Sequence, residues 1–259
     1  MMCKLSKIFK WFGINFSLIK NNIKGLRFYF ADLKKIKEQN KKEYFGPIKY
    51  YPILNERFEK AGNLSGHYFH QDLLVAQKIY INKPLKHIDI GSRMDGFISH
   101  LAVFRQVEVF DIRKQESKVE NIVFKQMDFM GTVPVEYINY TDSISSLHAI
   151  EHFGLGRYGD NIDVSGYLKG LNNINKMLKS GGKFYFSVPI GNQRIEFNAH
   201  RVFSIQYLLD IFQNDYELKS FSYVDDNGDL HSNIYLNQEN ILNNLNCRFG
   251  CGIFELVKK

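Results

Sequence analysis

The stretch KHIDIGSRMDGF, residues 86–97, decides the fold. Its first five residues form a short apolar run with the acid Asp89 next to its end, which is typical of a buried strand. Gly91 then allows the tight turn and close backbone approach that a ligand site needs, and a following helix would offer its positive N-terminus. By itself this is a common strand-to-turn sequence, so its meaning depends on the residues further along the chain.

The rest of the chain repeats an alternation of apolar runs and helical patterns. This alternation predicts an α/β fold: a Rossmann-like, doubly wound, mostly parallel seven-stranded sheet with helices on both faces and an antiparallel last pair at its edge. The predicted strands cover 87–90, 107–110, 122–125, 143–147, 183–188, 218–224 and 252–257, and the predicted helices cover 55–81, 97–105, 164–178 and 204–212.

Composition supports a folded protein of a reducing compartment. Hydrophobic residues make up 44% of the 259 residues and aromatic residues 15%, which excludes a disordered chain. The three cysteines (Cys3, Cys247 and Cys251) are too few for a disulfide framework, so we expect a cytoplasmic location. Cys247 and Cys251 have no second ligand pair at suitable spacing. We therefore interpret them as buried thiols and assign no metal ligands.

The basic charge lies at the start of the chain. Residues 1–42 carry eleven Lys and Arg against two acids, a net charge of +9, so the other 217 residues sum to −2. We expect a basic amphipathic helical arm over 1–45 and a Rossmann domain over 46–259. A nucleic-acid partner is not expected, because it would need a positive face on the folded domain.

The arm shows helical spacing of its apolar residues, with lysines on the other side. No apolar run reaches the ~18–20 residues that span a bilayer. Two interpretations remain: a peripheral helix on an anionic membrane at the inner face, or a helix packed on the domain or on a second subunit in an oligomer. The packing role is favoured. The apolar positions are Leu5, Ile8, Phe9, Phe12, Phe16 and Ile19.

Two further acids follow the first strand at informative distances. Asp111 ends the second strand 22 residues after Asp89, where a carboxylate accepts the two ribose hydroxyls of a nucleoside. Asp128 ends the third strand between Met127 and Phe129, where it would accept from an adenine amino group while its neighbours cover the ring. Each acid alone is as well explained as a turn residue. The ordered set of three favours a nucleoside ligand.

On these residues, segment 86–189 resembles the class I S-adenosylmethionine-dependent methyltransferases, and LKSGGK at 178–183 resembles the family's turn into strand five. Three segments are more narrowly similar to the family called domain of unknown function 268: GHYFHQD at 66–72, SLHAIEHFGLGRYG at 146–159 and NAHRVF at 198–203. That similarity covers residues 50 to about 215, so the domain over 46–259 is expected to be methyltransferase-like. It implies S-adenosylmethionine as cofactor, held by Asp89, Gly91, Ser92, Arg93, Gly96, Asp111, Ile112, Asp128, Phe129 and Leu147.

One departure from the family pattern concerns the first turn. Arg93 and Asp95 stand where the family usually has glycines. Arg93 would either clamp the cofactor's carboxylate or narrow the loop for a different ligand.

The fourth strand ends in the candidate chemistry. His148 or His152 would take a proton from an acceptor hydroxyl, and Glu151 would orient the imidazole. His200 is a further catalytic candidate at the same mouth. The candidates for acceptor binding are two histidines and three arginines suited to a phosphate or carboxylate: His67, His70, Arg157, Arg194 and Arg201.

The expected function is O-methylation of a small-molecule or glycan acceptor. The resemblance favours a sugar, nucleotide sugar or phosphorylated glycan group in bacterial surface polysaccharide, such as capsule or O-antigen. One alternative is a non-catalytic Rossmann binding module. Another is a metal-dependent hydrolase, because His148-x-x-Glu151-His152 matches a zinc peptidase pattern that needs both histidines on one helical face.

Overall fold

The computed structural model describes residue 9 and residues 12–62 and 64–259, and the chain divides into two compact units, 1–63 and 64–259. In the first unit, helix α2 (Phe16–Asn40) begins at Asn15, whose side chain accepts hydrogen bonds from the backbone of Ser17 and Leu18. A short 3-10 turn, η1, covers Glu56–Phe58. Within the described part of the chain, no helix is long and apolar enough to cross a membrane.

Two helix predictions in this region are corrected. Phe12 and Gly13 form a turn, so the apolar pattern that continues to Ile19 does not lie on one helix, and its members Leu5 and Ile8 fall outside the described residues. The helix predicted over 55–81 covers only α3 (His67–Asn82). Gly62 and Gly66 adopt positive φ angles of 128° and 94°, conformations that interrupt a helix.

The second unit contains one large sheet with the order β3-β2-β1-β4-β5-β10-β8-β9. All of its strand pairs from β3 to β5 are parallel, and β10 is antiparallel to both neighbours. The first five strands are β1 (His87–Ile90), β2 (Val107–Asp111), β3 (Ile122–Gln126), β4 (Thr141–Leu147) and β5 (Leu178–Ile190). The last three are β8 (Tyr216–Val224), β9 (Leu230–His231) and β10 (Gly250–Lys258).

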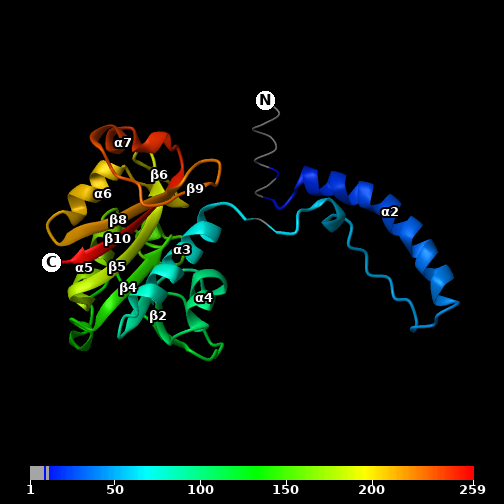
Figure 1. Ribbon diagram of the computed structural model, residues 1–259, viewed down its shortest axis with the longest axis horizontal. Helices are drawn as coiled ribbons and strands as arrows, with labels where there is room; N and C mark the ends of the chain where they lie inside the picture. The colour runs from blue at the N-terminus through cyan, green and yellow to red at the C-terminus, as the bar shows by residue number, and fades with distance from the viewer. Residues whose placement is uncertain (1–8, 10–11, 63) are drawn as a thin grey trace. The chain divides into compact units, whose positions relative to one another are not determined.

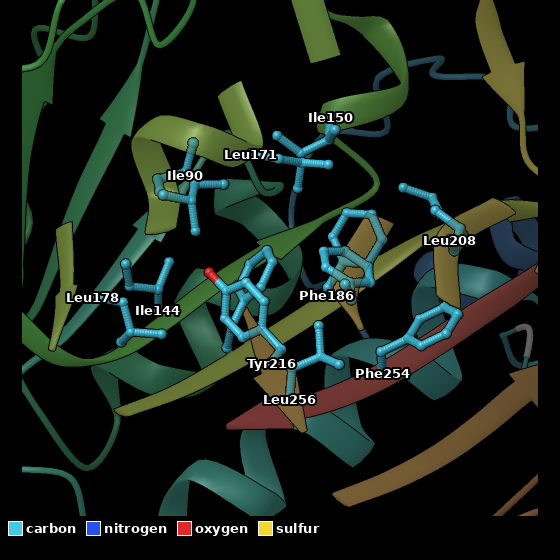
Figure 2. Packing of buried hydrophobic residues seen from close by; sticks show 14 of the residues in the cluster. Ile90, Ile144, Ile150, Leu171, Leu178, Phe186, Leu208, Tyr216, Phe254 and Leu256 are labelled. Carbon is cyan, nitrogen blue, oxygen red and sulfur yellow. The ribbon is translucent and has the colours of Figure 1, made fainter. Parts of the chain in front are cut away.

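Helices cover both faces of this sheet, as a doubly wound fold requires (Figure 1). On one face, α5 (Gly166–Met177) and α6 (Ile205–Phe212) pack over alternate residues of the central strands, such as Ile144 and Phe186 (Figure 2). On the other face lie α3, a π-helical turn, η2 (Met94–Ile98), and α4 (Ser99–Ala102). The alternation of strand side chains between the two faces therefore builds two hydrophobic cores.

The Rossmann-like sheet confirms the predicted fold class, with differences at its end. The main sheet has eight strands because a two-residue strand, β9, pairs with β8. The last strand in the sequence, β10, lies between β5 and β8 and is not at the edge. The short elements after β5 were not predicted: the hairpin β6 (Arg194–Glu196) and β7 (His200–Val202), α7 (Gln238–Leu242) and η5 (Asn244–Asn246). Two more 3-10 turns are η3 (Val135–Tyr137) and η4 (Ile150–His152).

Candidate functional site

A cavity of about 550 Å³, its open mouth included, lies at the carboxyl ends of the parallel strands. The strand order changes direction between β1 and β4, and ligands of open α/β sheets bind at this kind of position. The cavity is lined by residues that follow each of the first four strands: Ile90 and Gly91, Phe110 to Arg113, Met127 to Met130, and His148, Ala149, His152, Phe153, Tyr158 and Asp160.

Asp111 lies in this cavity as predicted, but it already has a partner. Arg113 donates to both carboxylate oxygens, from Nε at 3.0 Å and from an amino nitrogen at 2.6 Å. The Arg113 guanidinium also lies 4.4 Å from the centre of the Tyr158 ring. Half of the Arg113 side chain is exposed, whereas the Asp111 side chain beneath its guanidinium is nearly buried.

Asp128 and Phe129, which follow β3, form another part of the cavity wall. One oxygen of the exposed Asp128 carboxylate accepts from the Met130 amide at 2.8 Å. Phe129 is buried and packs edge-on against Phe110 at 5.8 Å between ring centres. Met127 also lines the cavity. This wall therefore offers a carboxylate beside apolar surface, which suits a flat polar ring.

The carboxylate of Asp89 stabilises the turn that follows β1. This carboxylate is fully buried and accepts hydrogen bonds from the Ser145 hydroxyl at 2.5 Å and from the Ser92 hydroxyl at 2.6 Å. Burial raises the pKa of Asp89 to about 7, although the Ser145 and Ser92 hydrogen bonds oppose that rise. Ser92 in turn accepts from the Leu147 amide at 2.9 Å, which ties β1 to β4. Asp89, Ser92 and Leu147 therefore shape the turn and do not line the cavity.

The two unusual turn residues pair with each other. Arg93 forms a two-pronged ion pair with Asp95, at 2.6 and 2.9 Å, on the surface. Neither residue lines the cavity. A Cβ at Gly96 would lie 2.6 Å from the Asp72 carboxylate, so that glycine serves close packing. Of the turn, only Gly91, with a φ of 71°, borders the cavity.

His148 and Glu151 form a buried ion pair at the end of β4. The Nδ1 of His148 lies 2.7 Å from Oε1 of Glu151, and both side chains are almost fully buried. Burial opposes the charged forms, but Cys251 and Glu151 outweigh it and raise the pKa of His148 well above its ordinary value. The pKa of Glu151 is lowered, because the nearby His148 outweighs the effect of burial. His148 has a φ of 50°, so the chain leaves the strand in a left-handed turn.

His152 differs from His148 because its pKa is lowered and its ring is neutral. Its Nδ1 lies 2.6 Å from the Ala199 carbonyl, so this nitrogen donates and the neutral ring carries its lone pair on Nε2. Burial lowers the pKa of His152, which keeps the ring neutral. Nε2 lies 3.8 Å from Glu151 Oε1, and the ring borders the cavity. The arrangement suits a proton acceptor.

The hydrolase pattern is not formed. His148 closes β4, and only Ile150–His152 forms a single 3-10 turn, so the two histidines do not share a helical face. A zinc peptidase needs both rings directed at one metal. The geometry argues against that alternative.

The other predicted site residues separate into two groups. His67 stacks on His148 at 5.2 Å between ring centres, and His200 lies 6.5 Å from the His152 ring. Arg157 is exposed and donates to the Ala199 carbonyl at 3.0 Å. These three border the same region. The other two lie elsewhere, since His70 contacts the neighbouring Phe69 and Arg194 pairs with Glu196. None of the five residues lines the cavity itself.

Arg201, predicted to bind the acceptor, has its guanidinium bonded to backbone carbonyls. Its side chain is buried, with the residue 4% exposed. The guanidinium donates to four backbone carbonyls, those of Glu151, Phe153, Asp163 and Val164, at 2.6 to 3.4 Å. It therefore fixes the loop after β4 and has little donor capacity left for a phosphate or carboxylate.

Several lining residues escaped sequence reasoning. Arg113 covers Asp111, and Asp160 accepts from the amides of Gly154 and Gly156 at 2.7 and 3.2 Å. Asp160 directly follows the conspicuous segment 146–159, so proximity to that motif was an available signal. Arg113, two residues after the ribose-side acid, had no such signal, because surface arginines are common near acids.

Comparison with known proteins identifies the family. A family model described as "Caenorhabditis protein of unknown function, DUF268" matches residues 98–246, more than half of the chain. The chain belongs to this family. The comparison with curated proteins finds no match.

Two solved structures similar to this family member are methyltransferases. The Burkholderia thailandensis 1,6-didemethyltoxoflavin-N1-methyltransferase, with bound 1,6-didemethyltoxoflavin and S-adenosylhomocysteine, is 11% identical with a TM-score of 0.52, over 73% of this chain and 78% of that one. The N-methyltransferase NodS from Bradyrhizobium japonicum WM9, in complex with S-adenosylhomocysteine, is 11% identical with a TM-score of 0.48, over 74% and 88%. The first likeness confirms the class I methyltransferase fold.

Proposed function

We propose that the protein is an S-adenosylmethionine-dependent methyltransferase. The observation that carries this proposal is the cavity at the β1–β4 switch point, which brings Gly91, Asp111 and Asp128 together beside His148 and His152. The class I fold supports it, because this edge of the sheet is where such folds bind ligands.

The residues that line the cavity suit the proposed cofactor in charge and chemistry. Asp111 would hold the ribose hydroxyls once Arg113 moves aside, and Asp128 with Phe129 would hold the adenine. Asp111, Asp128 and Asp160 outnumber the single arginine of the lining, which favours a cationic ligand. When bound, S-adenosylmethionine supplies an electrophilic methyl group on a positively charged sulfur.

His152 is the residue best placed to accept the acceptor's proton. Its Nε2 lone pair borders the cavity, and the Ala199 carbonyl fixes the ring orientation. A proton on Nε2 would be stabilised by Glu151 at 3.8 Å. A positioned general base of this kind contributes about 10²–10⁴-fold to proton transfer. Because His148 is already ionised by its pairing with Glu151, it holds Glu151 in place.

We propose a hydrophilic acceptor with a hydroxyl group, in the class of sugars, nucleotide sugars or phosphorylated glycan groups of surface polysaccharide. His200 and the exposed Arg157 lie beside His152 and provide donors for such a group. A screen of nucleotide sugars with labelled cofactor tests the acceptor class.

The cofactor is tested by calorimetric titration of the full chain with S-adenosylhomocysteine. We expect binding by the wild type and about 10- to 150-fold weaker binding by Asp111→Asn, because a hydrogen bond to a charged group contributes about 1.5–3 kcal/mol. Arg113→Gln is the matched variant. It should bind as well as the wild type or up to about fivefold more tightly, because an exposed ion pair worth ~0–1 kcal/mol no longer has to open.

Two results would contradict the proposal. Wild-type protein that binds no S-adenosylhomocysteine at millimolar concentration would favour the non-catalytic module. Equal binding by the wild type and Asp111→Asn would place the nucleoside elsewhere. Circular dichroism of each variant shows whether a loss of binding reflects loss of the fold.

We propose that the arm attaches the protein to the inner face of an anionic membrane. Its helix α2 exposes large apolar side chains, among them Ile23 at 64% and Phe30 at 62%, in a segment with a net charge of +9. Basic apolar helices bind anionic lipid surfaces. We expect the full chain to float with phosphatidylserine liposomes at least tenfold more than with neutral ones. Equal flotation with both liposome types, or none, would favour packing on protein.

A further inference from the structure

Three potential metal ligands from distant parts of the chain meet beside the cavity. They are His67 at the start of α3, His148 at the end of β4 and Cys251 on β10. One ligand atom of each lies within 4.8 Å of the others. Among the residues that the structure describes, no other group of three histidine, cysteine or acidic side chains meets this condition. None of these residues was assigned as a metal ligand from the sequence.

The buried Nε2 atom of His148 lacks a hydrogen-bond partner in the described structure. The side chain as a whole is 6% exposed. A buried polar atom of this kind costs about 1–3 kcal/mol when it is left unpaired. Nδ1 is already bound to Glu151, so a metal would bind at Nε2, where it would replace the proton of the charged ring.

Each histidine is also oriented from behind, as metal-binding histidines are. The bond from His148 Nδ1 to the Glu151 carboxylate, at 2.7 Å, sets the ring so that Nε2 is the free nitrogen. His67 makes a hydrogen bond to the backbone of Phe249 and stacks on the Phe249 ring at 5.4 Å. Carboxylates and backbone carbonyls that hold the second ring nitrogen are the usual supports of a histidine ligand.

We propose that His67, His148 and Cys251 bind a zinc ion. Two imidazoles and one thiolate form a mixed nitrogen and sulfur set, which zinc prefers over calcium or magnesium. At the tetrahedral angle, zinc bonds of about 2.0 Å to nitrogen and 2.3 Å to sulfur place two ligand atoms about 3.3–3.5 Å apart. Closure from 4.8 Å therefore requires an inward shift of up to about 1.5 Å, and the half-buried His67 at the first turn of α3 is placed to make it.

Three protein ligands leave a fourth zinc position for water or substrate, as in catalytic sites. His148 also lines the cavity, so this position would lie at its edge, near His152. On the proposed function, the metal would bind the hydroxyl oxygen of the acceptor and lower the pKa of that hydroxyl. Zinc binding itself does not depend on the methyltransferase proposal.

The experiment is a zinc titration of the full chain, purified without chelators, in competition with a chromophoric chelator. We expect one zinc per chain for the wild type. Cys251→Ser and His67→Gln should each bind at least about 100-fold more weakly, because each removes one of three ligands. Glu151→Gln should weaken binding about 10- to 100-fold by loosening His148.

The chain provides matched controls for both ligand variants. Cys247→Ser replaces a buried cysteine outside the cluster, and His70→Gln replaces a histidine one turn further along α3. Both should bind zinc as the wild type does. Cobalt gives a second measurement, because a thiolate ligand produces a charge-transfer absorption band. That band should be present in the two controls and absent in Cys251→Ser.

Three outcomes would overturn the inference. They are no zinc bound by the folded wild type, equal affinity in Cys251→Ser and Cys247→Ser, and a cobalt complex without the thiolate band. In each case Cys251 would not be a metal ligand. The His67→Gln variant alters a half-buried helix start, so it keeps the test valid if Cys251→Ser does not fold. Titration with S-adenosylhomocysteine separately decides the methyltransferase proposal.

Discussion

Arg201→Met should lower the free energy of unfolding by about 3–5 kcal/mol, the largest loss expected from a single substitution near the site. Methionine keeps much of the side-chain volume but removes every hydrogen bond to the carbonyls of Glu151, Phe153, Asp163 and Val164. Each buried carbonyl left without a donor costs about 1–3 kcal/mol, reduced where water enters. Urea unfolding of the full chain, followed by circular dichroism, measures the change.

Arg157→Met is the control for this prediction. Arg157 is exposed and donates to one carbonyl, that of Ala199, so its loss should change the free energy of unfolding by less than about 1 kcal/mol. If Arg201→Met unfolds at the same urea concentration as Arg157→Met, the buried hydrogen bonds do not stabilise the loop. Arg201 would then return as a candidate anion ligand.

Glu255→Gln should cost about 3 kcal/mol at neutral pH. Glu255 lies on β10, nearly buried, and its two oxygens accept from Lys78 and Lys183, each at 2.8 Å. Burial opposes its charge, but the hydrogen bonds from Lys183 and Lys78 outweigh this and lower the pKa of Glu255 to about 2. A fall of about two pKa units or more below the unfolded value corresponds to ~3 kcal/mol. Glutamine cannot carry the charge that these two lysines require.

This carboxylate also predicts the direction of acid sensitivity. Because the folded pKa is lowered, the stabilisation is present above the unfolded pKa, near ~4.3, and is lost as the pH falls towards 2. Unfolding by urea between pH 7 and pH 2 should thus show a smaller pH dependence in Glu255→Gln than in the wild type. Glu217→Gln removes an exposed partner of Lys219 and serves as control, with a change below ~0.5 kcal/mol. Parallel pH profiles for the wild type and Glu255→Gln would refute the prediction.

The sequence predicts those features that depend on neighbouring residues. Strand, turn and acid follow one another locally, so Asp111 and Asp128 are found at the cavity as expected. The helix predicted over 55–81 is wrong in its first half, and the cause is also local. The positive φ angles of Gly62 and Gly66 interrupt a helix there, although the surrounding apolar residues have helical spacing.

The features that the sequence does not predict depend on contacts between distant residues. Asp89 looks like a cofactor ligand until the structure places Ser145, 56 residues away, against it. Arg201 looks like an anion ligand until the carbonyls of two other loop segments are seen around it. The pairing of His67 with Cys251 joins residues near opposite ends of the Rossmann domain, and no spacing rule connects them.

The position of β10 has a consequence for how the protein is made. During synthesis, β5 and β8 leave the ribosome before β10, yet in the finished sheet they are joined only through it. The nascent sheet therefore remains in two parts, with exposed strand edges, until residues 250–258 emerge. Cys251 arrives with the same strand, so a nascent chain cannot complete the histidine–cysteine cluster before the two parts of the sheet are ready to join.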